Sequence, residues 1–139
     1  MEKINTDLTV IGAGPGGYVA AIRAAKLGIK TIIVEKENLG GVCLNTGCIP
    51  TKTLHYLSQS IDEIKKIGIY GLDIEKWSLN FKKTMERKDY IVNIQRKGIE
   101  SHLAANNISI ISGEGKLVDN NKVIIKNSKE KQVEVKAKN

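Results

Sequence analysis

The chain has 139 residues, of which 41% are hydrophobic and 27% charged, the balance of an ordinary soluble globular protein with one core. The net charge is +7, but the basic residues are interleaved with apolar ones and few aromatic residues lie among them. We therefore expect solvated faces rather than a nucleic-acid interface. No apolar run is long enough to span a membrane, and residues 1–7 are too polar for a signal peptide, so we expect a cytoplasmic protein.

The N-terminal part predicts two buried strands joined by a helix. Residues 8–11 and 31–34 are short apolar runs, as expected of strands in a parallel sheet. Between them, Pro15 suits the first turn of a helix, residues 18–27 are rich in alanine, and Gly28 can end the helix. This order predicts a βαβ unit with parallel strands.

The rest of the chain predicts two helices and a β-meander. The first helix follows a glycine-containing loop interrupted by Pro50, and residues 68–80 then read as irregular, with Gly68 as the stop. Residues 108–111 predict a strand, and the remainder predicts a β-hairpin or meander with its turn at residues 119–121. The first helix has on one face Leu54, Leu57, Ile61 and Ile64. The second, from about Phe81 to about Leu103, has an apolar stripe of Phe81, Met85, Val92, Ile99 and Leu103.

A glycine motif follows the first strand and fits G-x-G-x-x-G between residues 12 and 17. Gly12 permits a tight turn, Gly14 lets the backbone approach a pyrophosphate, and Gly17 lets the helix pack close to the strands. The helix N-terminus attracts the phosphates. Glu35, at the end of the second strand, can accept hydrogen bonds from a ribose diol and disfavours the 2′-phosphate of NADP. The motif leaves FAD and NAD both open, and an unliganded turn is the alternative.

The two cysteines, Cys43 and Cys48, are five residues apart. On a regular helix this spacing gives a rise of about 7.5 Å, which exceeds the Cα separation of a disulfide, about 4.4–6.8 Å. A bond between them therefore requires an irregular turn, which Gly47 and Pro50 could provide. A nearby helix N-terminus would favour the thiolate.

Three interpretations of this cysteine pair compete. A structural disulfide is disfavoured in a reducing cytoplasm. A zinc site that recruits His55 and His102 would have an unusual ligand spacing. A redox dithiol beside a bound flavin is the interpretation that we favour, with no metal.

The stretch from Gly40 to Lys52, Gly-Gly-Val-Cys-Leu-Asn-Thr-Gly-Cys-Ile-Pro-Thr-Lys, resembles the active-site signature of the pyridine nucleotide–disulfide oxidoreductases. The glycine motif, Glu35 and residues 113–116 occur in the family's order as well, so the resemblance covers essentially the whole chain. Within the family, the signature is more similar to the members that oxidise dihydrolipoamide than to those that reduce glutathione or mercuric ion. The residues that carry this distinction are Leu44, Ile49, Thr51 and Lys52.

The resemblance implies an α/β fold, in which residues 1–139 form a Rossmann-like FAD-binding domain with a parallel sheet and a C-terminal β-meander. It also implies roles for single residues. Cys43 would exchange with substrate, Cys48 would face the flavin, and Lys52 would stabilise the reduced flavin. The other residues expected to bind FAD are Gly12, Gly14 and Gly17 at the pyrophosphate, Glu35 at the ribose, Gly40, Gly41 and Cys43 along the cofactor, and Gly115 near the adenine.

The implied reaction is oxidation of protein-bound dihydrolipoamide, with electrons passing through the cysteine disulfide and FAD to NAD. The implied partners are the lipoyl domains of 2-oxo acid dehydrogenase complexes or of the glycine cleavage system, and a second copy in a homodimer. Family members are longer and continue into a final FAD-domain strand, an NAD domain and a dimerisation domain with a catalytic His–Glu pair, which neither His55 nor His102 matches. We therefore expect a fragment that is inactive alone. The alternatives are a glutathione- or mercuric-reductase-like enzyme, or a non-catalytic FAD-binding or redox module.

Overall fold

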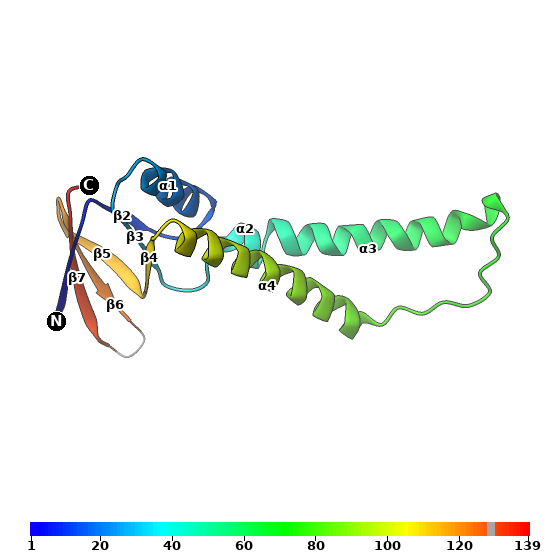
Figure 1. The fold of residues 1–139 in the computed structure, drawn as a ribbon. Helices are drawn as coiled ribbons and strands as arrows, with labels where there is room; N and C mark the ends of the chain where they lie inside the picture. The colour runs from blue at the N-terminus through cyan, green and yellow to red at the C-terminus, as the bar shows by residue number, and fades with distance from the viewer. Residues whose placement is uncertain (128–129) are drawn as a thin grey trace.

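The computed structural model describes residues 1–127 and 130–139, which form two stacked sheets with helices on one side (Figure 1). A parallel sheet has the order β2-β3-β4, and a second sheet has the order β1-β7-β6-β5. The strands are β1 (Glu2–Thr6), β2 (Leu8–Ile11), β3 (Thr31–Glu35), β4 (Ser109–Ser112), β5 (Glu114–Asp119), β6 (Lys122–Lys126) and β7 (Gln132–Ala137). The helices are α1 (Pro15–Lys26), α2 (Gly41–Asn45), α3 (Cys48–Lys66) and α4 (Phe81–Ala105), with a 3₁₀ turn at Ile67–Tyr70.

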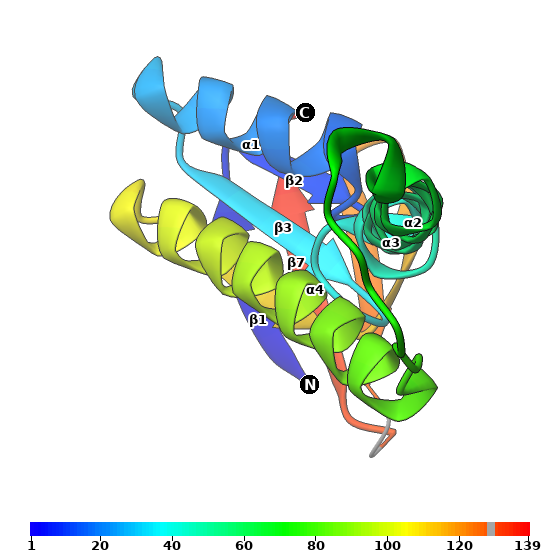
Figure 2. The same ribbon diagram turned by 90° about the vertical axis from the view of Figure 1, so that its right-hand side faces the viewer.

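Strand β3 lies at the centre of the layers because both of its faces are apolar. Ile33 packs toward α1 and α4, where it joins a core that includes Leu103 and Ile108. Its neighbours Ile32 and Val34 point the other way, onto the second sheet. In Figure 2 the layers follow one another along the viewing direction, with α1 and α4 in front of β3 and strands β1 and β7 behind it.

The predicted βαβ unit is confirmed. Strands β2 and β3 pair in parallel, with Val10 opposite Ile33, and β4 extends the parallel sheet on the other side of β3. Helix α1 begins at Pro15, which confirms the prediction that this proline lies in the first turn. Gly28 follows the helix with a φ of 81°.

The β-meander is also confirmed. Strands β5, β6 and β7 pair antiparallel in succession, and the predicted turn at residues 119–121 connects β5 to β6. Strand β1 was not expected, because residues 2–6 look polar. It pairs in parallel with β7, and alternate residues Ile4 and Thr6 turn inward while their neighbours stay exposed.

The two long helices extend away from the sheets, and the segment after the 3₁₀ turn connects their far ends (Figure 1). The apolar stripe of α4 is confirmed for its C-terminal half, where Val92, Ile99 and Leu103 are buried. It is wrong for Phe81, whose residue is 62% exposed. Phe81 begins α4 at the end distant from the sheets, where the core does not reach.

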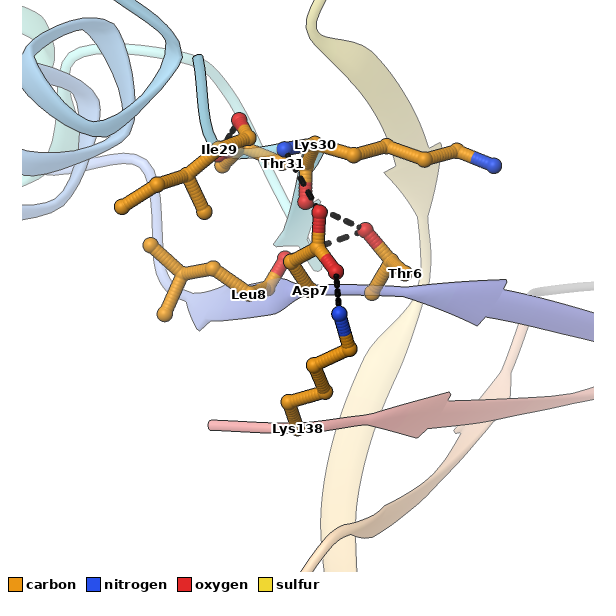
Figure 3. Close-up of polar contacts among 7 residues, drawn as sticks. All are labelled: Thr6, Asp7, Leu8, Ile29, Lys30, Thr31 and Lys138. Atoms are coloured by element: carbon orange, nitrogen blue, oxygen red, sulfur yellow. Dashed lines mark hydrogen bonds and ion pairs between the residues drawn. The ribbon is translucent and has the colours of Figure 1, made fainter. Parts of the chain in front are cut away.

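The junction between β1 and β2 connects the two sheets (Figure 3). Asp7 accepts a hydrogen bond from the backbone N–H of Lys30, at 3.1 Å, and pairs with the ammonium of Lys138 at 2.7 Å. The hydroxyl of Thr6 donates to the carbonyl of Lys30 at 2.7 Å. These contacts hold Lys30, just before β3, and Lys138, just after β7, against the junction between β1 and β2.

Asn139 lies beside β2, on the edge away from β3. Its N–H donates to the carbonyl of Asp7 at 3.0 Å, and its carbonyl accepts from the N–H of Thr9 at 3.1 Å. Residues 132–137 belong to the meander, so the pairing with β2 begins only after β7. None of the helices in residues 1–127 and 130–139 combines the length and the hydrophobicity of a membrane-spanning segment.

Candidate cofactor and disulfide site

The glycine motif forms a tight turn between β2 and α1. Gly12 has a φ of 97°, which favours glycine, and its N–H donates to the carbonyl of Val34 at 2.8 Å. A Cβ on Gly17 would lie only 1.9 Å from the carbonyl oxygen of Gly12. Glycine at both positions therefore lets α1 begin directly against the end of β2, with its N-terminal amide groups directed at the turn.

Glu35 ends β3 beside this turn, and backbone amides hold its carboxylate. One oxygen accepts from the N–H of Ala13 at 2.7 Å, and the other accepts from the N–H of Glu37 at 2.8 Å. Each carboxylate oxygen has more than one acceptor site. The Glu35 carboxylate is thus fixed in orientation and can still accept a hydrogen bond from a hydroxyl group.

A cavity of about 250 Å³ brings three of the expected cofactor residues together, namely Gly12, Glu35 and Gly115. Gly115 lies close to the sheet, since a Cβ on it would come within 3.2 Å of the Val34 side chain. Gly113 also lines the cavity, and its N–H donates to the carbonyl of Glu35 at 2.9 Å. The residues that line the cavity are Ile11, Gly12, Val34, Glu35, Lys36, Gly113, Glu114 and Gly115.

The loop that carries Gly40 and Gly41 packs onto the glycine motif. The N–H of Gly40 donates to the carbonyl of Ala13 at 2.8 Å. A Cβ on Gly41 would lie 2.8 Å from the Cα of Gly14, so the two backbones touch. The two motifs, 26 residues apart in sequence between Gly14 and Gly40, therefore form one continuous surface.

Cys43 and Cys48 are joined in a disulfide, with their Cα atoms 4.7 Å apart. The irregular turn that this bond requires is present, because α2 ends at Asn45 and α3 begins only at Cys48. Gly47 contributes as expected, since a Cβ there would lie 3.0 Å from the carbonyl oxygen of Val42. Pro50 does not distort the turn: it is buried in the first turn of α3, where proline is tolerated.

Lys52 lies one helical turn after Cys48 on α3, so the two side chains share a face of the helix. It lies outside the 250 Å³ cavity and lines a groove of about 590 Å³ between α3 and α4. The groove is lined by Ile49, Lys52, Thr53, Tyr56, Leu57, Ser60, Lys83, Thr84, Arg87 and Ile91.

The family model described as pyridine nucleotide-disulphide oxidoreductase matches residues 6–139, almost the whole chain. The chain belongs to this family. The matched region includes the Cys43–Cys48 disulfide.

The chain is similar to curated members of the family from several bacteria. It is 51% identical to a dihydrolipoyl dehydrogenase of Staphylococcus aureus over 93% of this chain and 28% of that protein. It is 48% identical to the dihydrolipoyl dehydrogenase of Geobacillus stearothermophilus over 89% of this chain and 26% of that protein. The enzyme of the same name from Bacillus subtilis is 47% identical over 86% of this chain and 26% of that protein. The chain thus spans about a quarter of the length of these relatives.

The histidines do not join the cysteines. In the described part of the chain, no group of three histidine, cysteine or acidic side chains is close enough together to hold a metal ion. His55 and His102 are exposed on α3 and α4, and both cysteines are used by the disulfide. This arrangement disagrees with a zinc site built from the four residues.

The relative exposure of the two cysteines differs from the family expectation. A thiol that exchanges with substrate, the role expected of Cys43, should be the more accessible of the two, but Cys43 is half-buried and Cys48 is exposed.

Asn45 and Arg96 form a side-chain contact that the sequence did not predict. The guanidinium of Arg96 donates from Nε and Nη2 to the side-chain oxygen of Asn45, at 3.2 and 2.7 Å. The amide nitrogen of Asn45 donates to the carbonyls of Leu39 and Gly41 at 3.0 and 2.8 Å. The sequence does contain a sign of this contact, because a charged residue at position 96 interrupts the apolar stripe of α4. Arg96 lies one turn after Val92 and one turn before Ile99.

Proposed function

We propose that residues 1–139 are the FAD-binding and disulfide-bearing domain of a dihydrolipoyl dehydrogenase. The observation that carries the proposal is the contact between Gly14 and Gly41. It joins the nucleotide turn to the loop before the Cys43–Cys48 disulfide, so a dinucleotide bound at the first would extend toward the second. The family and its relatives of that name support the same activity.

The residues of the site fit FAD. Gly12 and Gly14 leave the backbone bare before α1, and Gly17 lets the N-terminus of α1, where a pyrophosphate is best stabilised, lie directly against this turn. Glu35 would accept hydrogen bonds from the ribose hydroxyls, and Gly115 would contact the adenine side of the same cavity. Gly40, Gly41 and Cys43 would follow the cofactor toward its reactive ring, with Lys52 stabilising negative charge on that ring. FAD supplies a two-electron acceptor beside the dithiol.

The protein's own chemistry is a thiol–disulfide exchange. One thiolate of the substrate dithiol attacks the sulfur of Cys43, the Cys43–Cys48 bond breaks, and Cys48 leaves as a thiolate. The second substrate thiolate then attacks the mixed disulfide, which releases the oxidised substrate and the thiolate of Cys43. Two electrons now reside on the cysteine pair, and the two substrate protons pass to an external base.

The remaining parts of the proposal concern the complete enzyme. The substrate is dihydrolipoamide on the lipoyl domain of a 2-oxo acid dehydrogenase complex or of the glycine cleavage system. NAD accepts the electrons at a separate site, and the enzyme is a homodimer in the cytoplasm.

The test is to titrate the purified protein anaerobically with dihydrolipoamide, with glutathione as a competing thiol, and to record flavin absorbance. We expect bound flavin to be reduced by dihydrolipoamide in preference to glutathione, and no reduction in a Cys48→Ser variant. Tight NAD binding without flavin uptake, or an equal response to glutathione, would contradict the proposal.

A further inference from the structure

We propose that Arg96 is a positioning residue that acts through Asn45 to hold Cys43 within bonding reach of Cys48. The inference rests on the proposed redox function of the disulfide. It concerns a side chain of α4, more than forty residues from the cysteine motif in sequence, which the motif itself does not include.

Arg96 is a cation placed on an apolar stripe. It is half-buried, with the buried residues Val92 and Ile99 one turn away on either side. A charged group in such a place is destabilising unless hydrogen bonds satisfy it. Among the described residues, no carboxylate forms a salt bridge with Arg96. Its two short hydrogen bonds go to the oxygen of Asn45, and a longer one, at 3.5 Å, goes to Asn93.

This contact determines how Asn45 is oriented. A guanidinium has only donors, so the atom of Asn45 that faces it must be the oxygen. The amide nitrogen then faces the opposite way, toward the carbonyls of Leu39 and Gly41. Arg96 therefore fixes the one orientation in which Asn45 can bind the loop before α2.

Asn45 is the last residue of α2, the helix that carries Cys43. Its bonds to Leu39 and Gly41 tie the end of this short helix to its beginning, and the N–H of Gly40 ties the same loop to Ala13. A helix of five residues has little stability of its own. The geometry of α2 therefore depends on these side-chain contacts. Arg96 binds Asn45, and Asn45 in turn binds the backbone of α2 and of the loop before it.

The consequence appears when the disulfide is open. Cys43 and Cys48 are then connected only through the turn at Thr46 and Gly47, which lies outside both helices. A fixed α2 keeps the two thiols close together and so favours formation of the bond, whereas a loose α2 allows them to separate. Loss of Arg96 should shift the equilibrium toward the dithiol.

The experiment measures the thiol–disulfide equilibrium of the purified protein in glutathione buffers, with alkylation and mass analysis as the readout. Hydrogen bonds to a charged group contribute enough that we expect Arg96→Ala to shift the equilibrium toward the dithiol by about tenfold. Lys97→Ala is the matched control, because Lys97 is the exposed neighbour on the same helix, and it should leave the equilibrium unchanged. In Asn45→Ala, further removal of Arg96 should add little, because both residues act through one contact.

Arg96→Lys gives a second test with a small change in packing. Lysine keeps the charge and the aliphatic stem but lacks the two-donor fork, so we expect a shift of about threefold or more, with unchanged helical content by circular dichroism. A wild-type equilibrium in both Arg96 variants would overturn the proposal. If the wild-type cysteines themselves fail to cycle between dithiol and disulfide, the proposed redox function is wrong and the role of Arg96 falls with it.

Discussion

The backbones of Gly14 and Gly41 are in contact, so that a single methyl group on Gly41 would stand 2.8 Å from the Cα of Gly14. Gly41 also has a φ of 61°, a conformation that other residues rarely adopt. This pair of glycines holds the nucleotide turn and the disulfide loop together.

Gly41→Ala should therefore weaken FAD binding and reduce the free energy of unfolding by about 1–3 kcal/mol, because the loop must move away from α1. Flavin fluorescence quenching and urea denaturation measure the two effects. The matched control is Gly98→Ala in the middle of α4, where a Cβ would meet open space. It should raise the free energy of unfolding by about 0.5–1 kcal/mol and leave flavin affinity unchanged. Equal flavin affinity in both variants would contradict the role of the glycine contact.

The order in which the two thiols react should depend on flavin. In the reduced chain without FAD, we expect Cys48 to be alkylated faster than Cys43, in keeping with its greater exposure. Added FAD should reverse the order by covering Cys48. Peptide mass mapping after brief alkylation measures both rates. The same order with and without FAD, or retention of one zinc ion by the reduced chain, would count against the assigned roles.

Asp7 should stabilise the fold in a pH-dependent way. Its hydrogen bond with Lys138, together with the N–H of Lys30, lowers the pKa of Asp7. A carboxyl with a lowered folded-state pKa contributes stability above the unfolded-state value of about 3.9, and this stability is lost as the pH falls through the folded-state pKa.

Asp7→Asn should therefore lower the melting temperature at neutral pH, and the difference from wild type should shrink as the solution is acidified. The same contact raises the pKa of Lys138, so the Asp7 contribution should also decline in strongly alkaline solution. Asp62→Asn removes an exposed pair with Lys65 on α3 and serves as the control, with a small effect at any pH. A constant difference for Asp7→Asn across the acid range would be inconsistent with the ion pair.

The 139-residue chain with added FAD should not sustain lipoamide-dependent reduction of NAD. Turnover requires a base for the dithiol protons and a nicotinamide site, and this chain offers one glycine motif and two exposed histidines away from the cysteines. The assay is NAD reduction with dihydrolipoamide. Turnover of about 1 per second or faster, typical of enzymes, would refute the proposed mechanism.

The elements that the sequence predicted well are those whose local residue pattern already determines the structure that packing then stabilises. The apolar run at β3 and the glycine turn leave few alternatives, so the βαβ unit and the position of Gly12 were predictable. Gly47 was predictable as the break between the cysteines, because the spacing excludes a regular helix.

The elements that were missed depend on contacts distant in sequence. Strand β1 looks polar and becomes a strand because β7 offers it an edge. Helix α2 is too short to predict from periodicity and is held by Asn45 and Arg96. Phe81 fits the stripe of α4 by spacing, yet the core ends before it. Periodicity describes one helix and cannot tell how far its neighbours extend.

Helix α3 packs on the rest of the molecule through its N-terminal part, which faces α4 across the groove described above. Of its 19 residues only Pro50, in the first turn, is buried, while the helix extends for about 28 Å at 1.5 Å per residue. The disulfide adds a covalent fastening at the same end. Amide protons near Cys48 should consequently exchange with solvent slowly, and those toward Lys66 progressively faster. The local stability of α3 should therefore fall with distance from the cysteine pair, which anchors the helix.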